Sequence, residues 1–97
     1  MRVVTPKRLW EFSESHPSAR IALLNWYEIT RNSFWGNLNE IKRDFPSADY
    51  VGNNRIVFNI KGNRYRLVAI IIFASQKLYI RFIGTHSEYD KIDASTI

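Results

Sequence analysis

The second half of the chain is divided by short turns into three runs of β-forming residues, and this pattern limits the possible folds more than any other feature. The runs span residues 55–60, 64–73 and 78–83, and they are separated by residues 61–63 and 74–77. Connections this short join antiparallel neighbours, because a parallel pair of strands needs a longer crossover. The pattern therefore predicts an antiparallel meander of three strands.

The first half of the chain has a helical pattern. Residues 2–5 read as a short first strand, and Thr5 followed by Pro6 indicates the start of a helix with Thr5 as its cap. Pro17 breaks that helix at His16, because the residue before a proline disfavours helical backbone angles. A second helix is expected over residues 17–31, with a core stripe formed by Ala22, Trp26 and Ile29 and with Leu23 and Tyr27 alongside it.

A capping box predicts a third, short helix. Asn37 is the expected cap, Glu40 lies three residues further on, and Pro46 ends the helix. Helices in the first half and strands in the second are typical of an α+β fold, with the first two helices forming a hairpin against one face of the sheet. The 97 residues contain no repeat or linker, so residues 1–97 are expected to form a single domain.

Side chains alternate across a strand, so the sequence predicts the two faces of the sheet. The face expected beneath the helices is apolar and comprises Ile56, Phe58, Ile60, Leu67, Ala69, Ile71, Phe73, Leu78, Ile80 and Phe82. The opposite face carries polar and cationic residues among apolar ones, and these are Asn59, Arg64, Arg66, Tyr79 and Arg81 among Val57, Val68, Ile70, Ile72 and Ile83. We expect a groove on this face with one electropositive end.

Charge and composition narrow the function further. The net charge is +5, and no acidic residue occurs between Asp49 and Glu88. Such a basic region suits nucleic-acid binding, a docking face for an acidic protein, or a plain solvated surface. The absence of cysteine excludes a disulfide framework and a thiol nucleophile. No signal peptide is recognisable and no apolar run could span a bilayer, so the expected location is the cytoplasm.

His86 and Tyr89 come directly after the last predicted strand, where a rigid support can carry chemistry. Histidine transfers protons near neutral pH, and an arginine such as Arg66 can stabilise the charge that builds up on a phosphate. This set suits cleavage of RNA by its own 2′-hydroxyl, without a metal or cofactor. Alternatively, Tyr89 covers the core, Arg66 and Arg81 pair with Glu88 or Asp90, and His86 caps a turn or binds a metal with Asp90, four residues on.

Two segments resemble a known family. Residues 59–68, Asn-Ile-Lys-Gly-Asn-Arg-Tyr-Arg-Leu-Val, resemble the core of RelE-type toxins. Residues 80–90, Ile-Arg-Phe-Ile-Gly-Thr-His-Ser-Glu-Tyr-Asp, are similar to the C-terminal signature of the HigB branch, as are residues 45–49 and 57–59. The resemblance covers essentially the whole chain. It implies a RelE-like α+β fold, an antiparallel sheet with a helical hairpin on one face.

The resemblance also implies a function. RelE-like toxins cut mRNA, generally on the ribosome, and a cognate antitoxin, usually a HigA-like helix-turn-helix protein, neutralises them. Arg66 lies where these toxins place a phosphate-stabilising arginine, His86 lies near their second catalytic group, and Tyr89 is similar to their C-terminal tyrosine at a different spacing. The lysine pair that RelE carries is absent, and Val57 and Asn59 stand in its place. The general base therefore stays unidentified.

The remaining substrate-binding residues expected from the sequence are Lys61, Arg64, Arg81, Asn59 and Tyr79, with Lys61 or Arg64 replacing the missing lysines in part. Two other functions stay open. A ParE-like gyrase poison has a similar fold but does not need His86, and a non-enzymatic binding module would use only the basic face.

Overall fold

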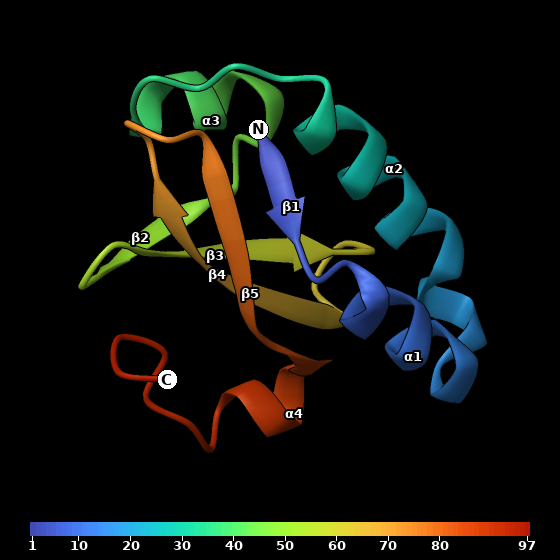
Figure 1. Ribbon diagram of the computed structural model, residues 1–97. Coiled ribbons are helices and arrows are strands. Elements are labelled where there is room, and N and C mark those ends of the chain that lie inside the picture. Colours follow the sequence, from blue (N-terminus) through green and yellow to red (C-terminus); the bar gives the residue numbers. More distant parts are fainter.

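The computed structural model describes all 97 residues, and the architecture is α+β (Figure 1). The elements are β1 (Arg2–Val4), α1 (Lys7–Ser15), the 3-10 turn η1 (Pro17–Ala19), α2 (Arg20–Arg31), α3 (Leu38–Asp44), β2 (Asp49–Gly52), β3 (Arg55–Ile60), β4 (Tyr65–Ile72), β5 (Lys77–Thr85) and α4 (His86–Tyr89). None of the helices combines the length and the apolar character that crossing a bilayer requires.

The five strands form one sheet in the order β1-β5-β4-β3-β2. The predicted meander of β3, β4 and β5 is confirmed, and β1 adds a parallel edge beside β5. Strand β2 is an antiparallel neighbour of β3 that the sequence did not reveal, because it has only four residues and an irregular register before Gly52. Asn53 and Asn54 make the turn that follows it, with φ angles of 52° and 63°.

The break between α1 and α2 is confirmed, but the predicted Thr5 cap is wrong. The chain leaves β1 through Thr5 in a left-handed conformation, with φ of 56°, and its hydroxyl donates to the Val4 carbonyl oxygen at 2.6 Å. Pro6 then occupies the cap position of α1, without a side-chain hydrogen bond. The predicted Asn37 cap of α3 is confirmed, since its side chain accepts a hydrogen bond from the Glu40 amide at 3.0 Å. The other half of the predicted capping box does not form, because the Glu40 carboxylate accepts from the Gly36 amide.

The core stripe of α2 was only partly predicted. Trp26 is buried, but Ala22 is only partly buried and Ile29 is 41% exposed. The residues that α2 and the end of η1 bury are Ala19, Leu23, Trp26 and Thr30. Their spacing of four, three and four residues marks one helical face, which Ile29 lies beside.

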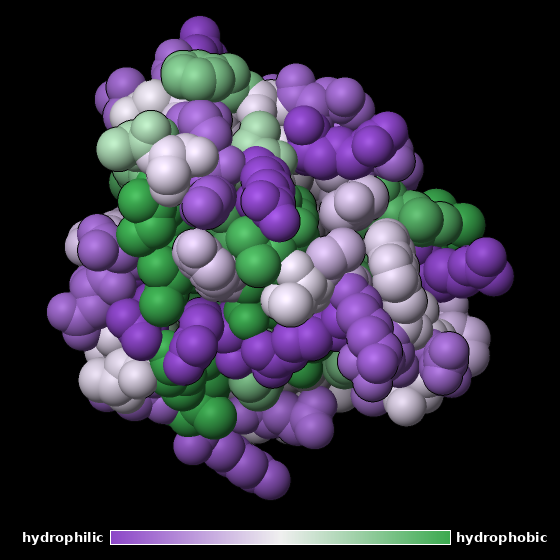
Figure 2. Space-filling view, in the orientation of Figure 1, coloured by the Kyte–Doolittle hydropathy of each residue, from purple (hydrophilic) through white to green (hydrophobic).

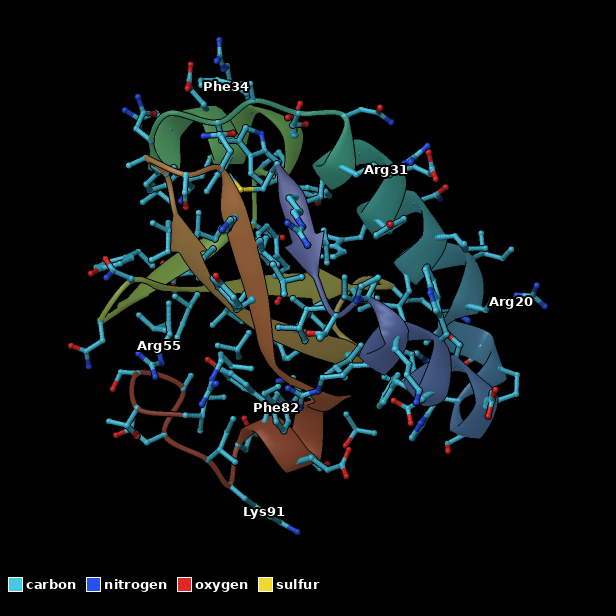
Figure 3. All side chains as sticks on the ribbon, viewed as in Figure 1. Arg20, Arg31, Phe34, Arg55, Phe82 and Lys91 are labelled. Atoms are coloured by element: carbon cyan, nitrogen blue, oxygen red, sulfur yellow. The ribbon has the colours of Figure 1, made fainter.

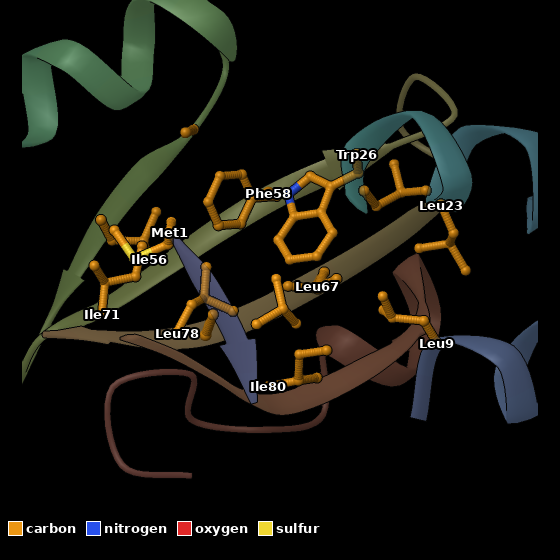
Figure 4. Close-up of a cluster of buried hydrophobic side chains, with 14 of the residues drawn as sticks. Met1, Leu9, Leu23, Trp26, Ile56, Phe58, Leu67, Ile71, Leu78 and Ile80 are labelled. Atoms are coloured by element: carbon orange, nitrogen blue, oxygen red, sulfur yellow. The ribbon is translucent and has the colours of Figure 1, made fainter. Parts of the chain in front are cut away.

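The main core lies between the sheet and the helices (Figure 4). Leu9 of α1 and Leu23 and Trp26 of α2 pack with residues of β3 and β4, and the rings of Trp26 and Phe58 meet edge to face at 5.4 Å. The predicted inner residues Leu67, Ala69 and Ile71 are buried here. This face of the sheet is therefore the one that the helices cover, as expected.

A β-bulge in β5 changes which side chains face the helices. Val68 pairs with Phe82 and Ala69 with Ile80, so Arg81 is an extra residue in β5. An extra residue shifts the alternation of all residues that follow it. Phe82 consequently turns to the outer face and Ile83 packs against the main core, so the prediction was wrong for both residues.

The outer face has a small core of its own. Val57 and Val68 are buried there against Ala94, with Phe82 and Tyr89 packed around them. The C-terminal segment crosses this face, and the Arg55 guanidinium holds it by donating to the Ile97 main-chain oxygen, with Nε at 2.7 Å (Figure 3). The prediction that Val57 and Val68 line an open groove is therefore wrong.

The outer core leads to a test of stability. Val68→Thr keeps the shape of the side chain but places a hydroxyl where Val68 has no exposed surface. We expect a loss of about 1–3 kcal/mol in the free energy of unfolding, measured by urea denaturation, because a buried hydroxyl without a partner is costly. Ile72→Thr on the exposed end of the same strand serves as the control, and equal effects of the two changes would contradict the outer core.

Candidate active site

The candidate site lies where β3, β4 and β5 end beside α4. Asn59, Arg66 and Gly84 are neighbours across the three strands, and all three face outward. Gly84 is buried, and the room that a side chain would need is already taken by the Phe82 ring and the Glu88 carboxylate. A Cβ atom at Gly84 would lie 2.6 Å from Cζ of Phe82, so this glycine makes room for the Phe82 ring.

Arg66 has no carboxylate partner. Its Nη1 atom donates to the main-chain oxygens of Asn63, at 3.0 Å, and Tyr65, at 3.4 Å. The ion pairs of the molecule join Arg31 to Glu28, Arg43 to Glu40 and His86 to Asp90. The alternative in which Arg66 or Arg81 pairs with an acidic residue is therefore wrong, and the remaining N–H groups of Arg66 are free to bind an anion.

Tyr89 has two structural neighbours. Its ring centroid lies 5.8 Å from Cζ of Arg66, within cation–π distance, and 6.4 Å from the centroid of the Phe82 ring. Tyr89 thus covers part of the outer core and also supports the guanidinium of Arg66. The two interpretations of Tyr89, as a residue that covers the core and as a residue of the site, are therefore compatible.

A capping box fixes α4 at the end of β5. The Thr85 hydroxyl accepts from the Glu88 amide at 3.2 Å, and the Glu88 carboxylate accepts from the Thr85 amide at 2.8 Å. The backbone hydrogen bond from Thr85, followed by its side-chain hydrogen bond, holds the pKa of Glu88 below its ordinary value of 4.5. The His86 amide also donates to the Arg64 carbonyl at 3.0 Å, which ties α4 to the start of β4.

His86 is held by one carboxylate. Its Nδ1 atom lies 3.0 Å from Oδ2 of Asp90, four residues on, and both side chains are about half exposed. This contact orients the imidazole ring and leaves Nε2 available for proton exchange. Three or more His, Asp or Glu side chains do not come close enough to one another anywhere in the molecule to hold a metal ion. His86 and Asp90 by themselves would supply two ligands at most.

The other predicted residues are only partly gathered at this site. Arg64 and Arg81 are exposed, at the start of β4 and at the bulge of β5. Lys61 donates from Nζ to the Ser18 main-chain oxygen at 3.1 Å, so it lies toward the helices. Tyr79 pairs with Ile70, five residues before Gly84, which places it roughly 15 Å from the Arg66 cluster along β5.

Sequence reasoning missed the residues that support the site. Phe82 was assigned to the wrong face, although its ring fills the room beside Gly84 at the site. The Thr85–Glu88 capping box was readable as Thr-x-x-Glu before a short helix, a pattern that signals a helix start. Asp90 was considered as a metal ligand and as a partner of Arg66 or Arg81, although its spacing from His86 also suits a hydrogen bond within a helical turn.

The capping box supports a prediction about α4. Glu88→Ala should lower the activity of this site severalfold, because the cap that sets the position of His86 and Tyr89 is worth about 1 kcal/mol. Glu88→Gln should retain most activity, since glutamine also accepts from the Thr85 amide.

The same carboxylate predicts a pH dependence. Because the pKa of Glu88 is lowered in the folded state, Glu88 stabilises the fold above about pH 4.5, and this contribution is lost as the pH falls through the folded-state pKa. Hydrogen exchange of the Thr85 amide should show this loss in the native chain and not in Glu88→Gln.

The five-stranded sheet and the helices that cover one of its faces are consistent with the fold of a RelE-like toxin. A family model described as the RelE-like toxic component of a toxin-antitoxin system matches residues 19–92. The chain belongs to this family, the HigB toxins.

Curated relatives agree along nearly the whole chain. The mRNA interferase toxin HigB of Escherichia coli (strain K12) is 36% identical over 93 residues, which are 93% of this chain and 88% of that protein. The mRNA interferase HigB of Shigella flexneri shows the same identity and coverage. A third relative, the mRNA interferase HigB of Escherichia coli O6:H1, is 26% identical over 94 residues, 95% of this chain and 91% of its own length.

Proposed function

We propose that residues 1–97 form a single toxin domain that cuts mRNA on the ribosome. The observation that carries the proposal is the unpaired Arg66 guanidinium beside Tyr89, at the sheet end that also carries His86 and Asp90. Membership of the HigB family supports it, and so do relatives named mRNA interferases.

The chemistry follows from these residue types. A base removes the proton of the 2′-hydroxyl, the 2′-oxygen attacks the adjacent phosphorus, and the 5′-oxygen leaves with a proton. Arg66 stabilises the negative charge on the five-coordinate phosphorus, and His86 exchanges a proton through Nε2 while Asp90 holds Nδ1. Tyr89 supports Arg66 and offers its ring and hydroxyl to a base or a phosphate. The products are a 2′,3′-cyclic phosphate and a 5′-hydroxyl.

The ribosome supplies what so small a protein lacks. It holds a codon in a defined geometry, and aligning the 2′-oxygen with its phosphate accounts for a large part of the rate. Arg64 and Arg81 are exposed cations that attract the RNA backbone, and Asn59 offers a polar side chain beside Arg66. Binding of RNA should therefore weaken as the salt concentration rises. Lys61 reaches RNA only by giving up its hydrogen bond to Ser18.

The partner is a HigA-like helix-turn-helix antitoxin, which binds a monomeric toxin within a larger complex in the cytoplasm. Induced expression of the chain alone should arrest growth and truncate translated messages, and co-expression of the antitoxin from the neighbouring reading frame should restore growth. Arrest with intact messages and broken DNA would contradict the proposal in favour of a gyrase poison.

The products provide a separate prediction. The upstream fragment should carry a 2′,3′-cyclic or 3′-phosphate and the downstream fragment a 5′-hydroxyl. End-group analysis by ligation and by polynucleotide kinase labelling distinguishes the two chemistries. A 5′-phosphate on the downstream fragment would contradict attack by the 2′-hydroxyl.

A further inference from the structure

We propose that the outward face of β1 and β5 is an RNA-binding extension of the active site, in which Tyr79 stacks on a base of the strand that is cut. The inference rests on the proposed function, because it concerns the same RNA beyond the scissile phosphate. It adds Arg2 and Lys77 to the residues that meet the substrate.

The register of β1 and β5 brings these side chains together. Arg2 pairs with Lys77 and Val4 with Tyr79 in the parallel ladder. The residues between them, Val3 and Leu78, are buried in the main core. Because neighbouring side chains point to opposite faces, Arg2, Val4, Lys77 and Tyr79 all face outward.

Tyr79 lies on an apolar platform. It is 37% exposed and is flanked by Val4 on β1 and by Ile70 on β4. Ile72, also 37% exposed, pairs with Lys77 and extends the platform toward the edge of the sheet. Figure 2 shows hydrophobic surface over this end of β4, bordered by hydrophilic residues over β1 and β5. An exposed ring among apolar neighbours and cations is the arrangement on which single-stranded nucleic acids stack.

The charge of this face favours RNA as its occupant. Strands β1, β3, β4 and β5 contain no acidic residue, and the outward cations near Tyr79 are Arg2, Lys77 and Arg81. Arg81 stands at the bulge, between Tyr79 and the Arg66 end of β5, so the cations continue from the active site to the platform. The strands themselves therefore present no acidic side chain to a polyanion, and the nearest carboxylates of the outer face, Asp90 and Asp93, lie on the segment that follows β5.

The spacing assigns the platform to a different nucleotide from the one that is cut. Tyr79 lies roughly 15 Å and Lys77 roughly 20 Å along β5 from Gly84, the cross-strand neighbour of Arg66. These separations exceed the reach of one nucleotide. The RNA held by Arg66 therefore has to pass along β5 by way of Arg81, beside the C-terminal segment that covers Val57 and Val68, before a base reaches Tyr79.

Photo-crosslinking identifies the occupant directly. Tyr79 is replaced by the photoreactive p-benzoylphenylalanine, and the toxin is irradiated with ribosomes paused on a labelled message. A crosslink to the message supports the proposal. Crosslinks to ribosomal RNA only, to ribosomal protein only, or to nothing overturn it. The same replacement at Tyr50, which is 50% exposed on β2, is the control and should not label the message.

Kinetics supply a second measurement that does not depend on the probe. Tyr79→Ala should reduce kcat/KM on ribosome-bound message about tenfold, the scale of one lost stacked base, whereas Tyr79→Phe should stay within about twofold. Lys77→Glu should reduce kcat/KM further at low salt and make it less sensitive to added salt, because one cation that contacts phosphate is lost and salt screens the new repulsion. Unchanged kcat/KM in Tyr79→Ala, with a native circular dichroism spectrum, overturns the extension while wild-type cleavage still supports the proposed function. Absence of cleavage by the wild type is instead a failure of the proposed function, and the crosslink still decides the extension.

Discussion

Arg66→Ala is expected to reduce cleavage of ribosome-bound message about a hundredfold or more, while the protein stays folded. The guanidinium is half-buried, has no carboxylate partner and is supported by the Tyr89 ring, so its charge is available to the phosphate. Removing one donor that stabilises charge in a transition state has a cost of this size. The loss should fall on kcat more than on KM, because the charge on phosphorus grows as the bond to the 2′-oxygen forms.

Two further variants make this test specific. Arg66→Lys should recover only part of the activity, because an ammonium keeps the charge but loses the planar pair of donors. Arg43→Ala removes the same charge from an exposed position on α3, where the residue pairs with Glu40, and should leave kcat unchanged. An equal loss in the Arg43 and Arg66 variants would show that net charge is the cause, and it would remove Arg66 from the mechanism.

His86→Gln is expected to lower kcat by about a hundredfold to ten-thousandfold, the range for a lost proton-transfer group. Glutamine can still accept or donate hydrogen bonds near Asp90, but it cannot exchange a proton near neutral pH. Asp90→Asn should cause a smaller loss and a shifted pH profile, because Asp90 acts through the imidazole. Lys91→Gln, which removes a charge just beyond α4, is the control. A folded His86→Gln protein with full activity would leave His86 as a structural residue only.

The sequence predicted the meander well because short turns allow few ways to join strands. It also placed Leu67, Ala69 and Ile71 correctly beneath the helices, since that inference needs only alternation along one strand. Alternation failed after Arg81, because nothing in the local sequence marks an inserted residue in β5. The bulge is visible only in the pairing with β4, and that pairing is a tertiary property.

For the candidate site, the sequence indicated which residues to consider but not how all of them are arranged in space. Arg66 and Tyr89 do lie together, since one is near a strand end and the other follows a strand that ends beside it. Lys61 was placed with them, but its side chain bonds to Ser18, which is 43 residues away along the chain. The covering of Val57 and Val68 by the C-terminal segment was equally hidden, because contacts between segments distant in the chain leave no periodic pattern.

The most direct test of the central claim is a primer-extension map of one message incubated with the purified chain, with and without translating ribosomes. The account predicts strong, discrete cleavage of the translated message, little or no cleavage of the free message, and loss of the cleavage bands with the Arg66→Ala protein. Equal cleavage in both reactions would contradict dependence on the ribosome. No cleavage in either reaction by folded wild-type protein would contradict the assignment of this site to RNA cleavage.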